Sequence, residues 1–144
     1  MGRLTVREPS ERYAHPRNAE LLKLLQKQAV AGTGDVYDLE GYELHAHPDL
    51  CDYVQAFNPY CYGGAYGVPV LANDRGILFG IAMGTSFVAF RLNEPERSET
   101  KAAGGSDFAK AGAGWVSVEA WRTESDLMTK WCRAAHAAAN AIKE

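Results

Sequence analysis

The sequence predicts an α+β domain in which helices pack on an antiparallel β-sheet. Between residues 68 and 92, three short runs rich in valine, isoleucine and phenylalanine are separated by turn residues, a pattern typical of consecutive strands. On both sides of this region, apolar residues recur at helical spacing instead. The connections between the three runs are too short for a parallel crossover, so we expect a three-stranded antiparallel meander.

Turn residues separate the three expected strands, which are residues 68–72, 76–83 and 86–92. The first connection, residues 73–76, begins with side chains that cap a turn and ends in a glycine that accepts positive φ. The second, Gly84-Thr85, suits a two-residue hairpin turn.

The middle strand carries no charge on either face, so we expect it to be covered on both sides. Strict alternation divides its side chains into two sets, Ile77, Phe79, Ile81 and Met83 on one face and Leu78, Gly80 and Ala82 on the other. A glycine inside a strand favours close approach of another backbone, and an alanine-rich C-terminal helix is the expected neighbour of Gly80.

The N-terminal half adds helices before the meander. Residues 1–17 show no sustained period and are expected to form an irregular N-terminal arm. Leucines at helical spacing then predict a first helix of about three turns, capped by Asn18 and stopped by Gly32. Residues 34–46 favour a short strand or extended loop, and a second helix begins near Pro48.

After the meander, Asn93 is expected to cap a third helix that ends at Gly104. Residues 115–121 alternate and predict a fourth strand of the sheet. Thr123, with Asp126 in the capping-box position, is expected to start a terminal helix. The apolar side of this helix contains Leu127, Met128, Trp131, Cys132, Ala135, Ala138, Ala139 and Ile142.

Length and composition indicate one globular domain. The 144 residues are 47% hydrophobic and 23% charged, and their net charge of −3 is spread over interleaved acidic and basic residues. This balance disfavours nucleic-acid binding, which needs clustered lysines and arginines. No stretch suits a membrane span or a signal peptide, so we expect a cytoplasmic protein that binds no membrane, with its three cysteines reduced.

The order of these features resembles the TfoX N-terminal domain family over about residues 60–141. The shared marks are a glycine-rich stretch at residues 63–67, the hairpin at residues 73–76, a strand ending in Phe90-Arg91-Leu92, an acidic helix closing with Ala102-Ala103-Gly104, a short strand at residues 116–121, and an alanine-rich helix bearing Trp131. The resemblance implies a two-layer domain over residues 18–144, with residues 18–59 as an extra N-terminal helical segment. The family includes the N-terminal half of a regulator of bacterial competence and offers no catalytic motif.

The resemblance implies a non-enzymatic interaction or regulatory domain that binds a protein partner or a second copy of itself. The alternative is a small ligand-binding domain or enzyme that uses residues 37–66, where six of the seven tyrosines fall. Tyrosine and tryptophan combine apolar area with a hydrogen-bonding end, which suits a binding surface. The candidate binding residues are therefore Tyr60, Tyr62, Tyr66 and Trp115. The same rings would equally suit a seam that attaches the N-terminal helices to the sheet.

No metal, cofactor or catalytic set is predicted. His45, His47, Cys51 and Cys61 are plausible metal ligands, but they lack the closely spaced pairs that zinc sites prefer. Pairing of Cys51 or Cys61 with His45 or His136 is conceivable and has no supporting motif.

Two short motifs are explained without function. The tripeptide at residues 47–49 matches the signature of J-domain co-chaperones without their preceding basic helix, and a helix start explains it. The glycine-rich stretches lack the lysine and hydroxyl residue of a phosphate-binding loop, so turn chemistry accounts for them.

Overall fold

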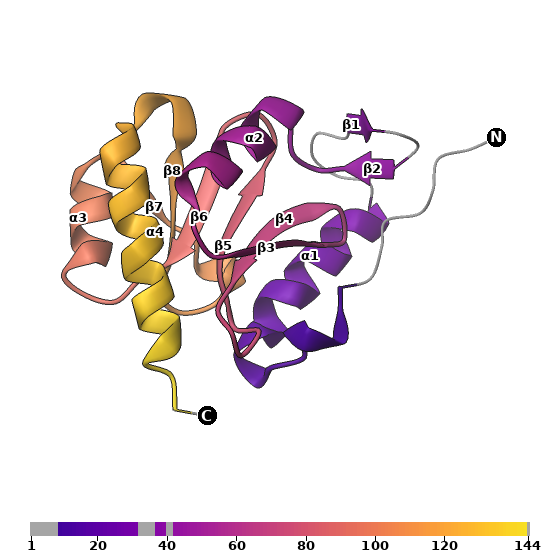
Figure 1. Ribbon diagram of the computed structural model, residues 1–144, viewed down its shortest axis with the longest axis horizontal. Coiled ribbons are helices and arrows are strands. Elements are labelled where there is room, and N and C mark those ends of the chain that lie inside the picture. Colours follow the sequence, from indigo (N-terminus) through magenta and orange to yellow (C-terminus); the bar gives the residue numbers. More distant parts are fainter. Residues whose placement is uncertain (1–8, 32–36, 40–41, 144) are drawn as a thin grey trace.

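The computed structural model describes residues 9–31, 37–39 and 42–143 (Figure 1). Six strands form one antiparallel sheet in the order β3-β4-β5-β6-β8-β7. Their bounds are β3 Cys61–Ala65, β4 Val68–Ala72, β5 Leu78–Met83, β6 Phe87–Arg91, β7 Ser106–Asp107 and β8 Trp115–Glu119. The α+β class, the antiparallel meander and the fourth predicted strand are confirmed. The glycine-rich strand β3 was not predicted as a strand.

Four α-helices accompany the sheet in the described part of the chain: α1 Ala19–Ala31, α2 Pro48–Phe57, α3 Glu96–Ala102 and α4 Ser125–Asn140. The described residues also form four short 3-10 turns. Two precede α1, η1 Glu11–Tyr13 and η2 Pro16–Asn18, and two lie between α3 and α4, η3 Ala109–Ala111 and η4 Ala120–Arg122. A separate hairpin pairs β1 Tyr37–Leu39 with β2 Tyr42–Leu44. The stop predicted at Gly32 lies outside the described residues.

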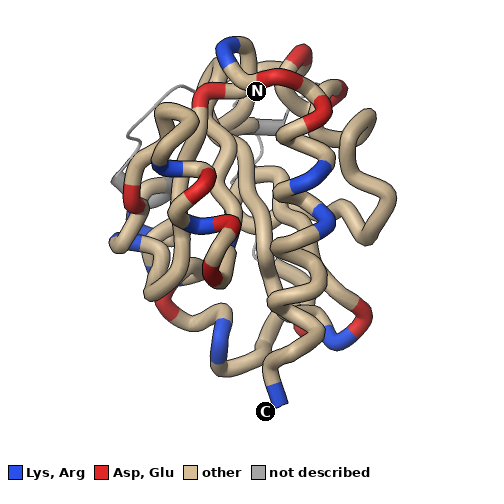
Figure 2. Tube along the Cα trace, turned by 90° about the vertical axis from the view of Figure 1, so that its left-hand side faces the viewer, with Lys and Arg blue, Asp and Glu red and all other residues tan. Residues whose placement is uncertain are grey.

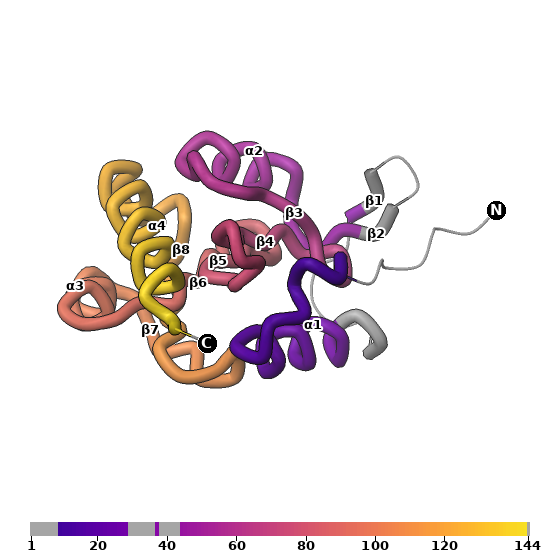
Figure 3. Tube along the Cα trace, turned by 60° about the horizontal axis from the view of Figure 1, so that its bottom comes forward, coloured from indigo at the N-terminus to yellow at the C-terminus, as the bar shows by residue number. Residues whose placement is uncertain are grey.

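Helices cover both faces of the sheet, so the predicted two-layer arrangement is wrong. Figure 3 shows α2 and α4 on one side of the strands and α1 on the other. The larger core lies beneath α2 and α4 and includes Phe79, Phe90 and Trp131. A second core packs Leu21 and Leu25 of α1 against the opposite face. Cover on both faces of the uncharged middle strand was predicted and is confirmed.

A β-bulge in β5 changes which residues share a face. Leu71 pairs with Gly80 while Ala72 pairs with Leu78, so Phe79 is an extra residue in the ladder. Phe79 and Ala82 therefore lie in the core beneath α4, whereas Leu78 and Ile81 lie in the core beneath α1. The strictly alternating faces predicted for this strand are wrong, because alternation holds only where no residue is inserted.

The first turn of the meander forms as predicted, with Gly76 at a φ of 77°. The second turn is longer than predicted, since Met83 pairs with Phe87 and leaves three residues between them. Gly84 has its own backbone partners at the end of β2. Its N–H donates to the carbonyl of His45 at 2.7 Å, and its carbonyl accepts from the N–H of His47 at 2.8 Å.

None of the three predicted capping side chains caps its helix. Asn18 is fully buried: its Nδ2 donates to the carbonyls of Tyr13 and Gly76, and its Oδ1 accepts from Leu78 N, all at 2.8 Å. These bonds fasten the start of α1 to the first turn of the meander.

At the other two helix starts the predicted side chains are not the caps either. At α3 the side chain of Glu94, rather than that of Asn93, accepts from a backbone N–H, that of Ser98. Thr123 donates its hydroxyl hydrogen back to the carbonyl of Glu119, and α4 begins after Glu124 without a side-chain cap.

Candidate functional site

The four predicted binding residues lie on opposite faces of the sheet. Tyr60 packs against the core beneath α2 and α4, and Tyr62 pairs in register with Leu71, which belongs to that core. Tyr66 packs against the core beneath α1, and Trp115 belongs to that second core. Only 2% of Trp115 is exposed. The structure therefore does not bring Tyr60, Tyr62, Tyr66 and Trp115 together on one surface.

Tyr60 forms part of an internal seam. Its ring stacks on His136 of α4, with centroids 3.6 Å apart and planes 4° from parallel. Phe79 meets both rings edge-on. Burial lowers the pKa of His136, and the charge of Asp74 partly offsets this shift. This arrangement attaches the residue before β3 to α4, and burial there favours the neutral form of His136.

Tyr62 faces α2, where it interacts with Cys51 and Gln55. Burial raises the pKa of Tyr62, and the neighbouring Cys51 adds to this shift. Burial also raises the pKa of the Cys51 thiol. A nucleophilic cysteine needs a lowered pKa, so Cys51 is held in the unreactive thiol form. The pKa shift of Cys51 is therefore opposite to that of an activated nucleophile.

The remaining candidate metal ligands are dispersed. His45 is buried, and His47 caps α2 by accepting the N–H of Asp49 at 3.0 Å. Cys61 lies on the opposite side of β3 from Tyr62 and meets the guanidinium of Arg12 at 3.7 Å. Within the described ranges, no three His, Cys, Asp or Glu side chains are grouped so that one metal ion could be held.

Trp121 is the most exposed large hydrophobic side chain of the described residues, at 54%. Its position is nevertheless well defined. The indole stacks on Tyr53 of α2 with centroids 5.0 Å apart and an interplanar angle of 25°. Its Nε1 donates to the carbonyl of Thr85 at 2.6 Å. An exposed tryptophan that is held by a stack and a hydrogen bond is suited to recognition, because little entropy is lost when a partner covers it.

The two segments that carry Trp121 and its partner Tyr53 are rich in acidic residues. The helix α2 contains Asp49 and Asp52 and no lysine or arginine. The segment from β8 into α4 adds Glu119, Glu124 and Asp126 against the one arginine Arg122, which pairs with Glu119 at 3.7 Å. Figure 2 shows acidic positions predominating at the top of the molecule, the end at which α4 begins in Figure 1. Elsewhere in that view, acidic and basic positions are interleaved.

The exposure of Trp121 was not predicted from the sequence. Trp121 was expected at the end of the fourth strand, but β8 ends at Glu119 and residues 120–122 form η4. This turn takes Trp121 out of the strand and onto α2. One feature of the sequence indicates this exposure. Trp121 is a large apolar residue that stands beside the polar Arg122 and Thr123, outside the alternating pattern.

The fold and these surfaces define an α+β protein with an exposed aromatic and acidic surface. Comparisons with protein-family models, with curated proteins and with solved structures found no match. Among the described helices, none combines the length and apolar character needed to cross a membrane.

Proposed function

We propose that this chain is a small cytoplasmic, non-enzymatic interaction domain of the TfoX N-terminal type, which binds a protein partner through Trp121. The fixed, exposed indole of Trp121 is the observation that carries the proposal. Tryptophan is enriched among the residues that dominate binding energy at protein interfaces. The family part of the proposal rests on the ordered motifs between residues 60 and 141.

The chemistry around Trp121 favours a basic partner. A lysine or arginine side chain can lie over an indole face and gain cation–π attraction. The carboxylates of Asp49, Asp52 and Glu119 would strengthen this attraction and speed the encounter. A second copy of the chain would bring the same acidic residues face to face in a two-fold contact. The surface therefore favours a different, basic protein over self-association.

Photo-cross-linking in the native cell tests this proposal. A photoreactive residue at Ala56, exposed on α2 one turn from Tyr53, should give an adduct of one discrete mass. The matched control is Ala102, exposed at the end of α3. We expect Trp121→Ala to abolish the Ala56 adduct. Asp52→Lys, a charge reversal on the exposed side of α2, should weaken it without affecting the fold.

Equal adducts from Ala56 and Ala102, or an Ala56 adduct that survives Trp121→Ala, would contradict the proposal. An adduct of twice the chain's own mass would identify a second copy as the partner. Thermal melts of each variant confirm that the folded domain is being compared.

A further inference from the structure

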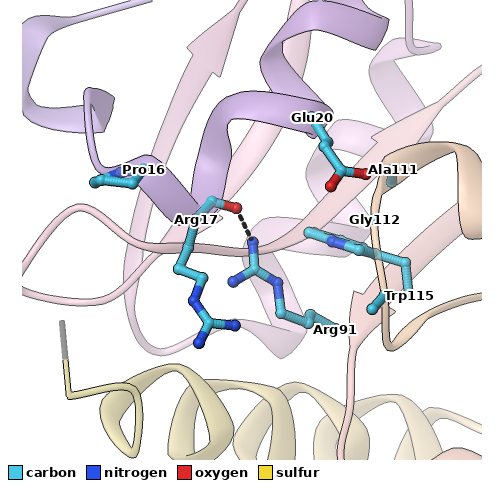
Figure 4. Close-up of a pocket in the computed structure, with 8 residues that line it drawn as sticks. Pro16, Arg17, Glu20, Arg91, Ala111, Gly112 and Trp115 are labelled. Atoms are coloured by element: carbon cyan, nitrogen blue, oxygen red, sulfur yellow. Dashed lines mark hydrogen bonds between the residues drawn. The ribbon is translucent and has the colours of Figure 1, made fainter.

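A pocket of about 160 Å³ lies on the α1 side of the sheet (Figure 4). Trp121 lies on the other side of the sheet, stacked on Tyr53 of α2. The turn η2 supplies Pro16 and Arg17, and the first turn of α1 supplies Glu20. The neighbouring strands β6 and β8 supply Arg91 and Trp115, and the end of η3 with the loop after it supplies residues 111–113. These segments are far apart in the sequence, and no motif marks the pocket.

Arg91 is positioned by two neutral groups. Its guanidinium lies over the ring of Trp115, 5.3 Å from the centroid, and donates to the carbonyl of Arg17 at 3.0 Å. No carboxylate of a described residue lies within ion-pair distance of Arg91. A guanidinium has five N–H donors, so most of those of Arg91 remain available for another acceptor.

A second cation raises the electrostatic cost of this arrangement. Figure 4 shows Arg17 on one side of Arg91. Trp115 and Glu20 lie on the other side of Arg91. Burial, together with the charge of Arg17, lowers the pKa of Arg91 to about 10. Both causes disfavour the charged guanidinium, and a bound anion would relieve both.

The size and walls of the pocket limit what can bind. Pockets for drug-sized molecules enclose roughly 300–1,000 Å³, so about 160 Å³ suits a much smaller molecule. Gly112, at a φ of 124°, borders the pocket near Trp115 without a side chain. The carboxylate of Glu20 lies beside Gly112 and limits how much negative charge the pocket can accept.

We infer that this pocket binds a small anion, whose carboxylate or phosphate group lies between the guanidinium groups of Arg17 and Arg91. Planar guanidinium groups match both kinds of oxyanion in geometry and charge. The ring of Trp115 supports Arg91 from behind. This site is independent of Trp121 and its partner.

The experiment titrates the full chain with inorganic phosphate and, separately, with acetate, while sodium chloride keeps the ionic strength constant. The readout is the NMR signals of the Trp115 indole N–H and the amides of Gly112 and Gly114. We expect saturable shifts confined to these groups, with a dissociation constant on the order of millimolar. The anion that saturates identifies the group that the pocket prefers.

Three variants make the test specific. Arg17→Gln removes an exposed charge and should weaken binding by about tenfold or more. Glu20→Gln removes the opposing carboxylate and should tighten binding severalfold. Arg122→Gln, exposed and outside the pocket, should leave binding unchanged. Shifts that do not saturate for either anion, or that are the same in Arg17→Gln, would overturn the inference.

Discussion

Replacing Gly80 with alanine should destabilise the fold, because Gly80 makes room for a neighbouring side chain. A Cβ atom at this position would lie 2.9 Å from Cδ1 and 3.3 Å from Cγ of Leu71, its partner in the ladder. Leu71 is itself buried and must move to accept the methyl group. The helix backbone predicted to approach Gly80 is not its nearest neighbour.

The magnitude follows from overpacking. A buried side chain forced from its rotamer and an inserted methyl group together cost about 1–3 kcal/mol. For a domain of this size, each kcal/mol corresponds to roughly 2–4 °C in Tm. The matched control is Gly64→Ala in β3, where the nearest atom to a new Cβ is the Val68 carbonyl oxygen at 3.9 Å. This control should change stability by less than about 1 kcal/mol.

A double-mutant cycle measured by urea unfolding isolates the Gly80 contact. Leu71→Ala alone leaves a cavity and should cost about 2–5 kcal/mol. In the double variant the new methyl group occupies part of that cavity and no longer collides with Leu71. We therefore expect the double variant to be less destabilised than the sum of the two single changes, by about 0.5–3 kcal/mol. Additive free energies, or a Gly80→Ala variant as stable as Gly64→Ala, would refute the reasoning.

Two further predictions concern one buried and one partly buried polar side chain. The carboxylate in Asn18→Asp cannot donate to the carbonyls of Tyr13 and Gly76, so this variant should lower the free energy of unfolding by about 2–5 kcal/mol in a urea titration. The control Asn93→Asp, at an exposed position, should be nearly neutral in the same titration. Because the pKa of His136 is lowered in the folded chain, the unfolded chain binds the proton first, so stability should fall as pH drops below the ordinary value of 6.5. His136→Phe keeps a ring against Tyr60 and should flatten this pH dependence; an unchanged slope in thermal melts between pH 7 and about pH 5 would show that His136 is not its source.

The sequence by itself determined the antiparallel meander and the helices around it. Alternation, helical spacing and turn residues are local properties, and they identify β4, β6 and the buried side of α4, including Trp131 and Cys132. The same local signals identified the cover on both faces of the middle strand. They also predicted that Tyr60 and Tyr66 belong to one binding surface, whereas these tyrosines lie on opposite faces of the sheet.

Only the tertiary structure decided the features that depend on distant neighbours. Asn18 carries the residue type of a helix cap, yet the carbonyl of Gly76 and the N–H of Leu78 draw it into the core. Of the three tryptophans, two are buried and Trp121 alone is exposed, because η4 turns it onto Tyr53. Arg17 and Arg91 are 74 residues apart and become neighbours only when α1 packs across the sheet. Residue type states which bonds a side chain can make, while the packing of elements far apart in the chain decides which of those bonds are formed.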